Sequence, residues 1–160
     1  MRRAEGPKDV APIVCLNPRR GLWRVRLAIT PTETGAEWYE QDFEHRPTAD
    51  EIRALFVELV NENVQNKIRE GLTYEGAMVW LSAENQLNYR NALDVAMQTD
   101  GDSLPVVFKL GTDSEPVYRE FRSVESLQAF VNCCARYVQQ CLEEGWRRKE
   151  AFDVEPYLRE

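Results

Sequence analysis

The sequence is poor in the residues on which most catalytic sites depend. Its 160 residues contain one histidine, His45, and four cysteines. It has no GxGxxG, GxxxxGK[ST], HExxH or GxSxG motif, the signatures of dinucleotide, phosphate, zinc-protease and serine-hydrolase sites. His45 lies beside Pro47 with no cysteine or serine motif near it, so we expect a loop residue rather than a general base. The sequence therefore predicts a protein with no catalytic residues and no cofactor.

The cysteines argue against both a disulfide framework and a zinc site. Cys134 and Cys141 lie on one expected helix, about 10.5 Å apart at 1.5 Å per residue. A disulfide needs Cα atoms within about 7 Å, which leaves Cys15 as the one available partner for any of the others. No spacing fits a zinc site, and Cys133 or Cys134 would need a histidine from another part of the chain to act as a nucleophile. We therefore expect free, mostly packed thiols and a reducing compartment.

Two acidic loops are the remaining candidates for a metal. Asp100 with Asp102 forms one, and Asp113 with Glu115 forms the other. The twelve-residue EF-hand pattern is absent, because no glutamate stands in the closing position. We expect solvated turns and assign no metal ligand.

Long apolar runs and an excess of basic charge are also missing. No stretch of 18 apolar residues is present, so we expect no membrane span. The apolar run at 10–16 is broken by Pro12 and does not fit a secretory signal. Twenty basic residues against 27 acidic ones give a net charge of -7, so a phosphate backbone would meet a repulsive average field. Nucleic acid is therefore not an expected partner, although a local basic patch could override the mean.

The length and composition are those of one globular domain, with 43% hydrophobic and 29% charged residues. The first 20 residues contain three prolines and few residues suited to packing. We expect a mobile N-terminal arm at 1–20, a single domain at 21–153 and a C-terminal tail at 154–160.

From residue 21 onward, two strands followed by a helix are expected three times. The first hairpin combines an alternating strand at 23–29 with a second strand at 37–44. The first helix begins at Thr48, which has capping-box spacing to Glu51, and ends at Gly71.

The second and third units follow the same order. A hairpin at 72–81 precedes a helix capped by Ser82, and a hairpin at 106–121 precedes a helix capped by Ser123. The last helix should stop near Gly145, or bend there and continue to residue 152. The predicted fold is α+β: three successive ββα units forming an antiparallel sheet with helices packed against it.

Two polar and aromatic clusters are candidates for an interaction surface. Amide side chains on the central helix could hydrogen-bond a ligand or a partner chain, or could solvate the helix and tie down the adjoining hairpin. Aromatic residues on the strands could pack in the core or form an exposed patch for a partner or a sugar. The candidate residues are Trp23, Trp38, Tyr39, Tyr74, Trp80, Asn85, Gln86, Asn88 and Tyr89.

Most of the chain resembles a family of uncharacterised prophage proteins. Its second half is similar to a domain that is often encoded beside or within phage tail-fibre genes. The stretches that carry the resemblance are structural rather than catalytic, so they imply no active residues. They are RVRLAIT at 24–30, PTADEI at 47–52, VWLSAENQLNY at 79–89, LPVVFKLGTDSEPVY at 104–118 and EEGWRRKEAFD at 143–153.

The resemblance implies a non-catalytic phage protein, either a tail-associated virion component or an accessory factor for tail-fibre assembly. Its partners would be other tail or fibre proteins or further copies of itself, in the bacterial cytoplasm during assembly or in the virion. For self-association, the exposed faces of residues 130–142 and of the aromatic strands are the expected surfaces. The alternative is a binding module for a small ligand or glycan that uses the strand aromatics and the amides near Asn85. An enzyme ranks third.

Overall fold

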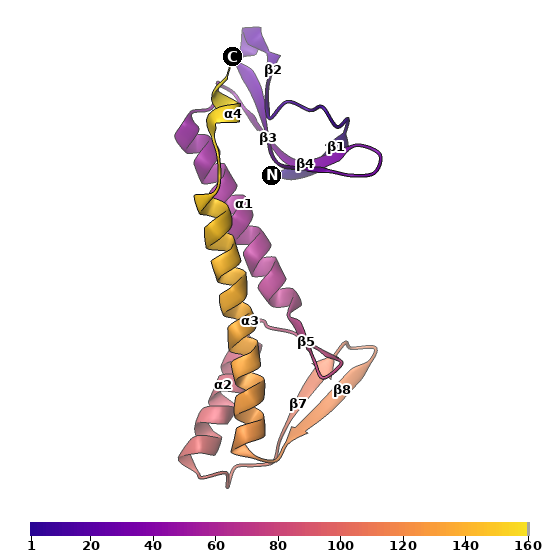
Figure 1. Cartoon of the computed structure of the whole chain (residues 1–160), viewed down its shortest axis with the longest axis vertical. Helices are drawn as coiled ribbons and strands as arrows, with labels where there is room; N and C mark the ends of the chain where they lie inside the picture. The colour runs from indigo at the N-terminus through magenta and orange to yellow at the C-terminus, as the bar shows by residue number, and fades with distance from the viewer. Residues whose placement is uncertain (160) are drawn as a thin grey trace. The chain divides into compact units, whose positions relative to one another are not determined.

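The computed structural model describes residues 1–159 and confirms the α+β class (Figure 1). The chain forms two compact units. Unit 1 contains Met1–Asn61 together with the residues from Arg148 onward, and unit 2 contains Glu62–Arg147. The sequence predicts a single domain at 21–153, and the structure divides this region within two of its helices, α1 (Ala49–Glu70) and α3 (Val124–Glu150).

Unit 1 is built on a four-stranded antiparallel sheet. Its strands are β1 (Arg2–Gly6), β2 (Ile13–Asn17), β3 (Leu22–Pro31) and β4 (Ala36–Phe43), in the order β1-β4-β3-β2. A short 3-10 turn, η1 (Pro18–Arg20), connects β2 to β3, and the side chain of Asn17 accepts from the first free amides of this turn.

The N-terminal arm expected to be mobile at 1–20 contributes both edge strands of this sheet. β1 pairs with β4 from Arg2 opposite Glu40 to Gly6 opposite Ala36. Its sequence, RRAEG, has no alternating apolar residues, so pattern reading misses it. Main-chain pairing with β4 holds it instead, together with the contact of Arg2 with the buried Glu40.

The C-terminal residues also belong to the fold of unit 1. α4 (Glu155–Leu158) carries Tyr157, which is buried and donates a hydrogen bond from its hydroxyl to the main-chain oxygen of Arg26 at 3.1 Å. Phe152 stacks on Phe56 of α1 with ring centroids 4.0 Å apart. The expected tail at 154–160 is therefore helical at 155–158 and packed through Tyr157.

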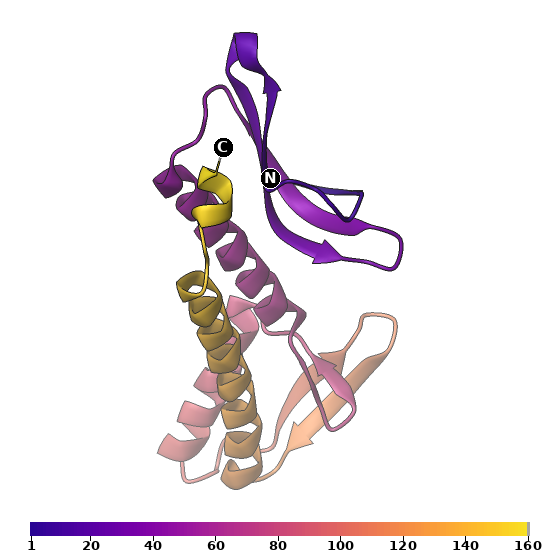
Figure 2. The same cartoon turned by 45° about the horizontal axis from the view of Figure 1, so that its top comes forward.

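Unit 2 contains two further sheets and the helix α2 (Ala83–Gln98). β5 (Leu72–Tyr74) pairs with β6 (Ala77–Val79), and β7 (Val106–Gly111) pairs with β8 (Pro116–Phe121), both antiparallel. The strands of the described chain thus form three sheets, whereas the sequence pattern predicts one. β6 lies against β7 without joining its ladder (Figure 2).

The predicted helix caps at Thr48, Gly71, Ser82 and Ser123 are confirmed. The Thr48 amide donates to Glu51 at 2.8 Å, and the Glu51 amide donates back to the Thr48 hydroxyl at 3.3 Å. Gly71 adopts a φ of +78° and donates to the carbonyls of the last turn of α1, as a left-handed helix cap does. Ser82 and Ser123 accept from amides three residues on, and α3 continues through Gly145 to Glu150.

An aromatic cluster forms the core of unit 2. Phe130 of α3 is fully buried and contacts four aromatic rings at centroid distances of 5.0 to 5.8 Å. These rings come from β5, β7, β8 and α2, so one side chain of α3 contacts four further elements of the unit. They are Tyr74, Tyr89, Phe108 and Phe121.

Candidate interaction surface

The nine predicted surface residues do not form one site. Trp38 and Tyr89 are buried, with exposed fractions of 6% and 5%, so core packing accounts for them. Trp23 is half-buried and lies under the Arg46 guanidinium, 5.2 Å from its ring centroid. Tyr39 is half-buried on the sheet of unit 1, and Tyr74 packs edge-on against Phe130 in unit 2.

The amides of the central helix mostly bind the protein itself. Asn85 donates from its side chain to the Trp80 carbonyl at 3.0 Å, and Gln86 donates to the Leu81 carbonyl at 2.8 Å. Both bonds hold α2 to the segment that leaves β6, which is the structural alternative considered for these residues. Asn88 is exposed.

Trp80 is the one predicted aromatic that is well exposed, and the hairpin β7–β8 adds further residues beside it. Its indole is 46% exposed, and its Nε1 donates to the Gly111 carbonyl at 2.8 Å. Lys109 pairs directly with Tyr118 across the hairpin, and Val107 lies two residues from Lys109, so all three share one face of the sheet. Val107 is 53% and Tyr118 is 68% exposed. We call Trp80, Val107, Lys109 and Tyr118 the hairpin surface.

A hollow of about 370 Å³ opens beside the hairpin surface. It is lined by Trp80, Asn85, Lys109, Gly111 and Asp113. The Lys109 ammonium lies 2.6 Å from the Asp113 carboxylate. This hydrogen bond and the opposite charges raise the pKa of Lys109 and lower that of Asp113, so both are charged at neutral pH. The indole N–H, the Asn85 amide and the ion pair are thus already engaged within the protein.

The opposite face of the hairpin is anchored in the core. Phe108 and Phe121 lie within the aromatic cluster around Phe130. Burial raises the pKa of Tyr89, which packs against Phe108 at 4.7 Å. The hairpin surface is therefore presented on a support held by packed side chains.

In unit 2, the thiols have no histidine beside them that could activate a nucleophile. Cys134 and Cys141 are buried, and burial raises the pKa of Cys134 to about 12. Cys133 lines a second hollow of about 290 Å³ with Leu72, Arg136, Tyr137 and Gln140. Unit 2 contains no histidine in its sequence, so no cysteine–histidine pair exists within it.

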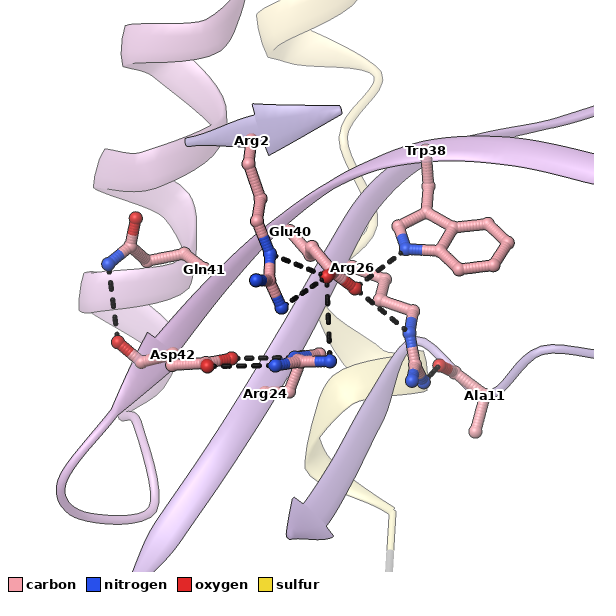
Figure 3. Close-up of polar contacts among 8 residues, drawn as sticks. All are labelled: Arg2, Ala11, Arg24, Arg26, Trp38, Glu40, Gln41 and Asp42. Atoms are coloured by element: carbon pink, nitrogen blue, oxygen red, sulfur yellow. Dashed lines mark hydrogen bonds and ion pairs between the residues drawn. The ribbon is translucent and has the colours of Figure 1, made fainter. Parts of the chain in front are cut away.

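Unit 1 contains a charged network that pattern reading missed (Figure 3). Glu40 of β4 is 5% exposed and accepts hydrogen bonds from Arg2 at 2.8 Å and from the Trp38 indole at 3.0 Å. Arg24 and Arg26 of β3 reach the same carboxylate at 3.5 and 3.7 Å. The signal was available, because β3 and β4 place arginines and carboxylates directly opposite one another.

The network is tied to the chain segment that connects β1 to β2. Arg26 donates from its side chain to the Ala11 carbonyl at 2.9 Å and from its backbone to the Pro12 carbonyl at 2.7 Å. Its guanidinium lies over the Trp38 ring, 5.5 Å from the centroid. These bonds hold residues 11–12 against β3, which is a structural role.

The charge state of Glu40 follows from its partners. Burial alone would raise its pKa, but the hydrogen bond from Trp38 and the charges of Arg24 and Arg2 outweigh burial and lower it. Asp42 is held ionised in the same way by a two-pronged contact with Arg24 at 2.6 and 2.8 Å. Both acids are occupied by arginines, so neither is placed to move a proton.

His45 belongs to the cap of α1. Its Nε2 lies 2.8 Å from the Glu51 carboxylate, which also accepts from Thr48. The backbone hydrogen bond from Thr48 is the main cause that lowers the pKa of Glu51. The geometry gives His45 a place in a helix-capping network.

Within residues 1–159, no group of three or more metal-ligating side chains is found. The described helices are each too short or too polar to cross a membrane. Comparison of the chain with protein-family models, with curated proteins and with solved structures gives no match.

Proposed function

We propose that this chain is a non-catalytic protein-binding component of a phage or prophage, acting in the tail or in tail-fibre assembly through its hairpin surface. The phage assignment rests on the sequence resemblance over residues 23–153. The binding role rests on one observation. Tyr118 is 68% exposed on a hairpin whose other face is packed into the core, and Trp80, just after β6, is 46% exposed and hydrogen-bonded to the end of β7.

Exposed aromatic residues on a rigid support suit a protein partner. Tyrosine and tryptophan supply large contact areas with few rotatable bonds, so little side-chain entropy is lost when they are covered. Lys109 and Asp113 flank them, as polar residues surround the apolar centre of many interfaces. The Trp80 indole N–H, the Asn85 amide and the Lys109–Asp113 pair already bond within the protein. This favours an apolar protein–protein contact over a polar ligand-binding pocket.

The proposal is tested by affinity capture of the tagged full chain from a phage-producing lysate, with mass spectrometry of the captured proteins and of purified particles. We expect fibre or baseplate proteins to be captured by the parent chain. The double variant Trp80→Ala, Tyr118→Ala should lose them. The control is Leu87→Ala, Val95→Ala on α2, which also removes two exposed apolar side chains and should capture them normally.

A parent chain that captures no phage protein and is absent from particles would rule out the tail role. Equal capture by the two double variants would instead place the contact elsewhere on the chain.

The alternative function is a small-ligand or glycan module that uses the hollow beside Trp80. The observation in its favour is that an exposed indole and the Asn85 amide line one concave site. A glycan array with the full chain tests it, since Trp80→Ala should abolish any signal that arises from this hollow.

A further inference from the structure

β8 is an outer strand whose exposed edge is free to pair. Residues 116–120 are all exposed, and within the described chain the main chain of β8 pairs with β7 alone, while the Arg119 side chain forms an ion pair with Glu75. On the other side of the hairpin, β6 lies against β7 (Figure 2). The Trp80 indole donates to the Gly111 carbonyl at the end of β7. The two edges of this small sheet thus differ, because the β7 edge is covered and the β8 edge is not.

The hairpin turn identifies the main-chain groups that point outward from β8. The Thr112 amide donates to the Glu115 carbonyl at 3.2 Å, so residues 112 and 115 are a hydrogen-bonded pair. Hydrogen-bonded and non-bonded pairs alternate along an antiparallel ladder, and this one has no bulge from Val106 to Phe121. Residues 117, 119 and 121 therefore bond to β7. The N–H and C=O groups of Tyr118 and Glu120 point away from β7, and so does the C=O group of Pro116.

A row of outward N–H and C=O groups selects an extended chain as its partner. When β8 pairs with β8 of a second copy, the bonded pairs must be formed by even-numbered residues. A register centred on Arg119 sets two arginines opposite each other, and one centred on Glu120 sets two glutamates opposite each other. A register centred on Val117 would pair only residues 116–118 of the two strands, because Glu115 already lies in the turn. A register centred on Tyr118 avoids both like-charge contacts and pairs residues 116–120. It places Tyr118 opposite Tyr118, Val117 opposite Arg119 and Glu120 opposite Pro116.

We propose that two copies of this chain associate through antiparallel pairing of their β8 strands, centred on Tyr118, to form a continuous sheet β7-β8-β8-β7. The two Tyr118 amides and carbonyls bond each other, and each Glu120 amide bonds the Pro116 carbonyl of the other copy. The Tyr118 rings meet at the two-fold axis, on the same face as Lys109 and Val107. The two hairpin surfaces then form one symmetric surface twice as large.

This inference rests on the proposed interaction role and specifies how the hairpin is used, yet its test needs no phage component. Sedimentation equilibrium of the purified full chain measures the mass, which is 18.6 kDa for one copy. We expect a concentration-dependent increase to twice that mass. Tyr118→Pro removes an amide that points outward and leaves the bonds to β7 in place, so it should shift the protein to the monomer with an unchanged circular dichroism spectrum.

A matched pair of charge variants at Val117 tests the register. Val117 is 43% exposed and would face Arg119 of the other copy. Val117→Lys should raise the dimer Kd on the order of tenfold and Val117→Glu should lower it, since each change acts at two symmetric positions. Both variants make a comparable change at the same exposed site, so a folding defect would affect them alike.

A parent chain that stays monomeric at all concentrations overturns the proposal. So does a dimer that is insensitive to Tyr118→Pro and to the charge at Val117. A monomeric parent whose capture of a tail protein is abolished by Tyr118→Pro would also overturn it, because the edge would then bind a strand of that partner. A dimer with the expected sensitivities that captures no tail protein supports this inference while refuting the phage role.

Discussion

The indole Nε1 of Trp80 donates a hydrogen bond to the main-chain oxygen of Gly111, 2.8 Å away. Gly111 ends β7 with a φ of +78°, and a Cβ at this position would lie 2.3 Å from the Glu115 carbonyl. Glycine is therefore required where the turn begins. The bond links the residue after β6 to that turn, and so joins the two hairpins of unit 2 at one point.

Replacing Trp80 should weaken unit 2 in two steps. Trp80→Phe removes the hydrogen bond and keeps most of the apolar contact, so we expect a loss of about 1 kcal/mol in the free energy of unfolding. Trp80→Ala also removes that contact and should cost about 2 kcal/mol, because the side chain is only half-buried. Urea unfolding followed by far-ultraviolet circular dichroism measures both. Tyr118→Ala is the control, measured at a concentration where the protein is monomeric, and its free energy of unfolding should stay within about 0.5 kcal/mol of the parent. Equal losses at Trp80 and Tyr118 would contradict a stabilising role for the Trp80–Gly111 bond.

Gly71 and Gly76 form a matched pair for backbone strain. Both have a positive φ, of +78° and +83°. A Cβ at Gly71 would lie 1.7 Å from the Val79 carbonyl, whereas one at Gly76 would meet nothing within 4 Å. We expect Gly76→Ala to cost about 1 kcal/mol, from its backbone conformation alone, and Gly71→Ala to cost on the order of 3 kcal/mol. Thermal unfolding of the two variants separates these values, and similar midpoints would show that the β6 backbone moves aside freely.

Local rules predicted the helix ends of this chain, because capping depends on residues only a few positions apart. Thr48 with Glu51, Ser82, Ser123 and Gly71 each act as their spacing indicates. The α+β class followed from the same signals.

The sheets were harder to predict, because strand pairing depends on residues far apart in the sequence. β1 is held by main-chain pairing with β4 and by Arg2 with Glu40, 38 positions away, so no local pattern shows it. Three-residue strands such as β5 carry too few positions to reveal which sheet they join.

The candidate surface was predicted only in part, and for a related reason. Trp80 was named from its residue type, but Val107 and Tyr118 were not, because Val106, Val107, Phe108 and Leu110 show no clean alternation from which a face could be assigned. Burial of Trp38 and Tyr89 likewise depends on their long-range neighbours.

The thiols of α3 should differ in reactivity. Burial raises the pKa of Cys134 to about 12, so at pH 8 its thiolate fraction is on the order of 10⁻⁴. Cys133 is half-buried beside an open hollow. We expect iodoacetamide to modify Cys133 in the native protein well before Cys134 and Cys141, as read by peptide mass spectrometry. All four cysteines should react in denaturant, which is the control, and fast native labelling of Cys134 would show that α3 opens locally.

Glu40 should make the sheet of unit 1 sensitive to acid. Glu40→Gln keeps the shape and the acceptor for the Trp38 indole but leaves the arginines facing a neutral group. We expect a cost of about 2 kcal/mol at pH 7, less than for a fully buried pair because the Arg2 side chain is 62% exposed. Hydrogen exchange of peptides from β1, β3 and β4 measures it. Asp42→Asn is the control, and should cost under about 1 kcal/mol because Asp42 is 39% exposed.

The pH dependence of this difference identifies its electrostatic origin. The folded-state pKa of Glu40 lies below its ordinary value of 4.5, so the unfolded chain takes up a proton first as the pH falls. The stabilisation is then complete above about pH 4.5 and is lost as the pH drops through the lower, folded-state pKa. Protection in the parent should therefore fall toward that of Glu40→Gln in acid, whereas the variant lacks this contribution to the pH dependence. A difference in hydrogen-exchange protection between the parent and Glu40→Gln that stays constant from pH 7 down to about pH 3 would mean that Glu40 acts through packing rather than through its charge.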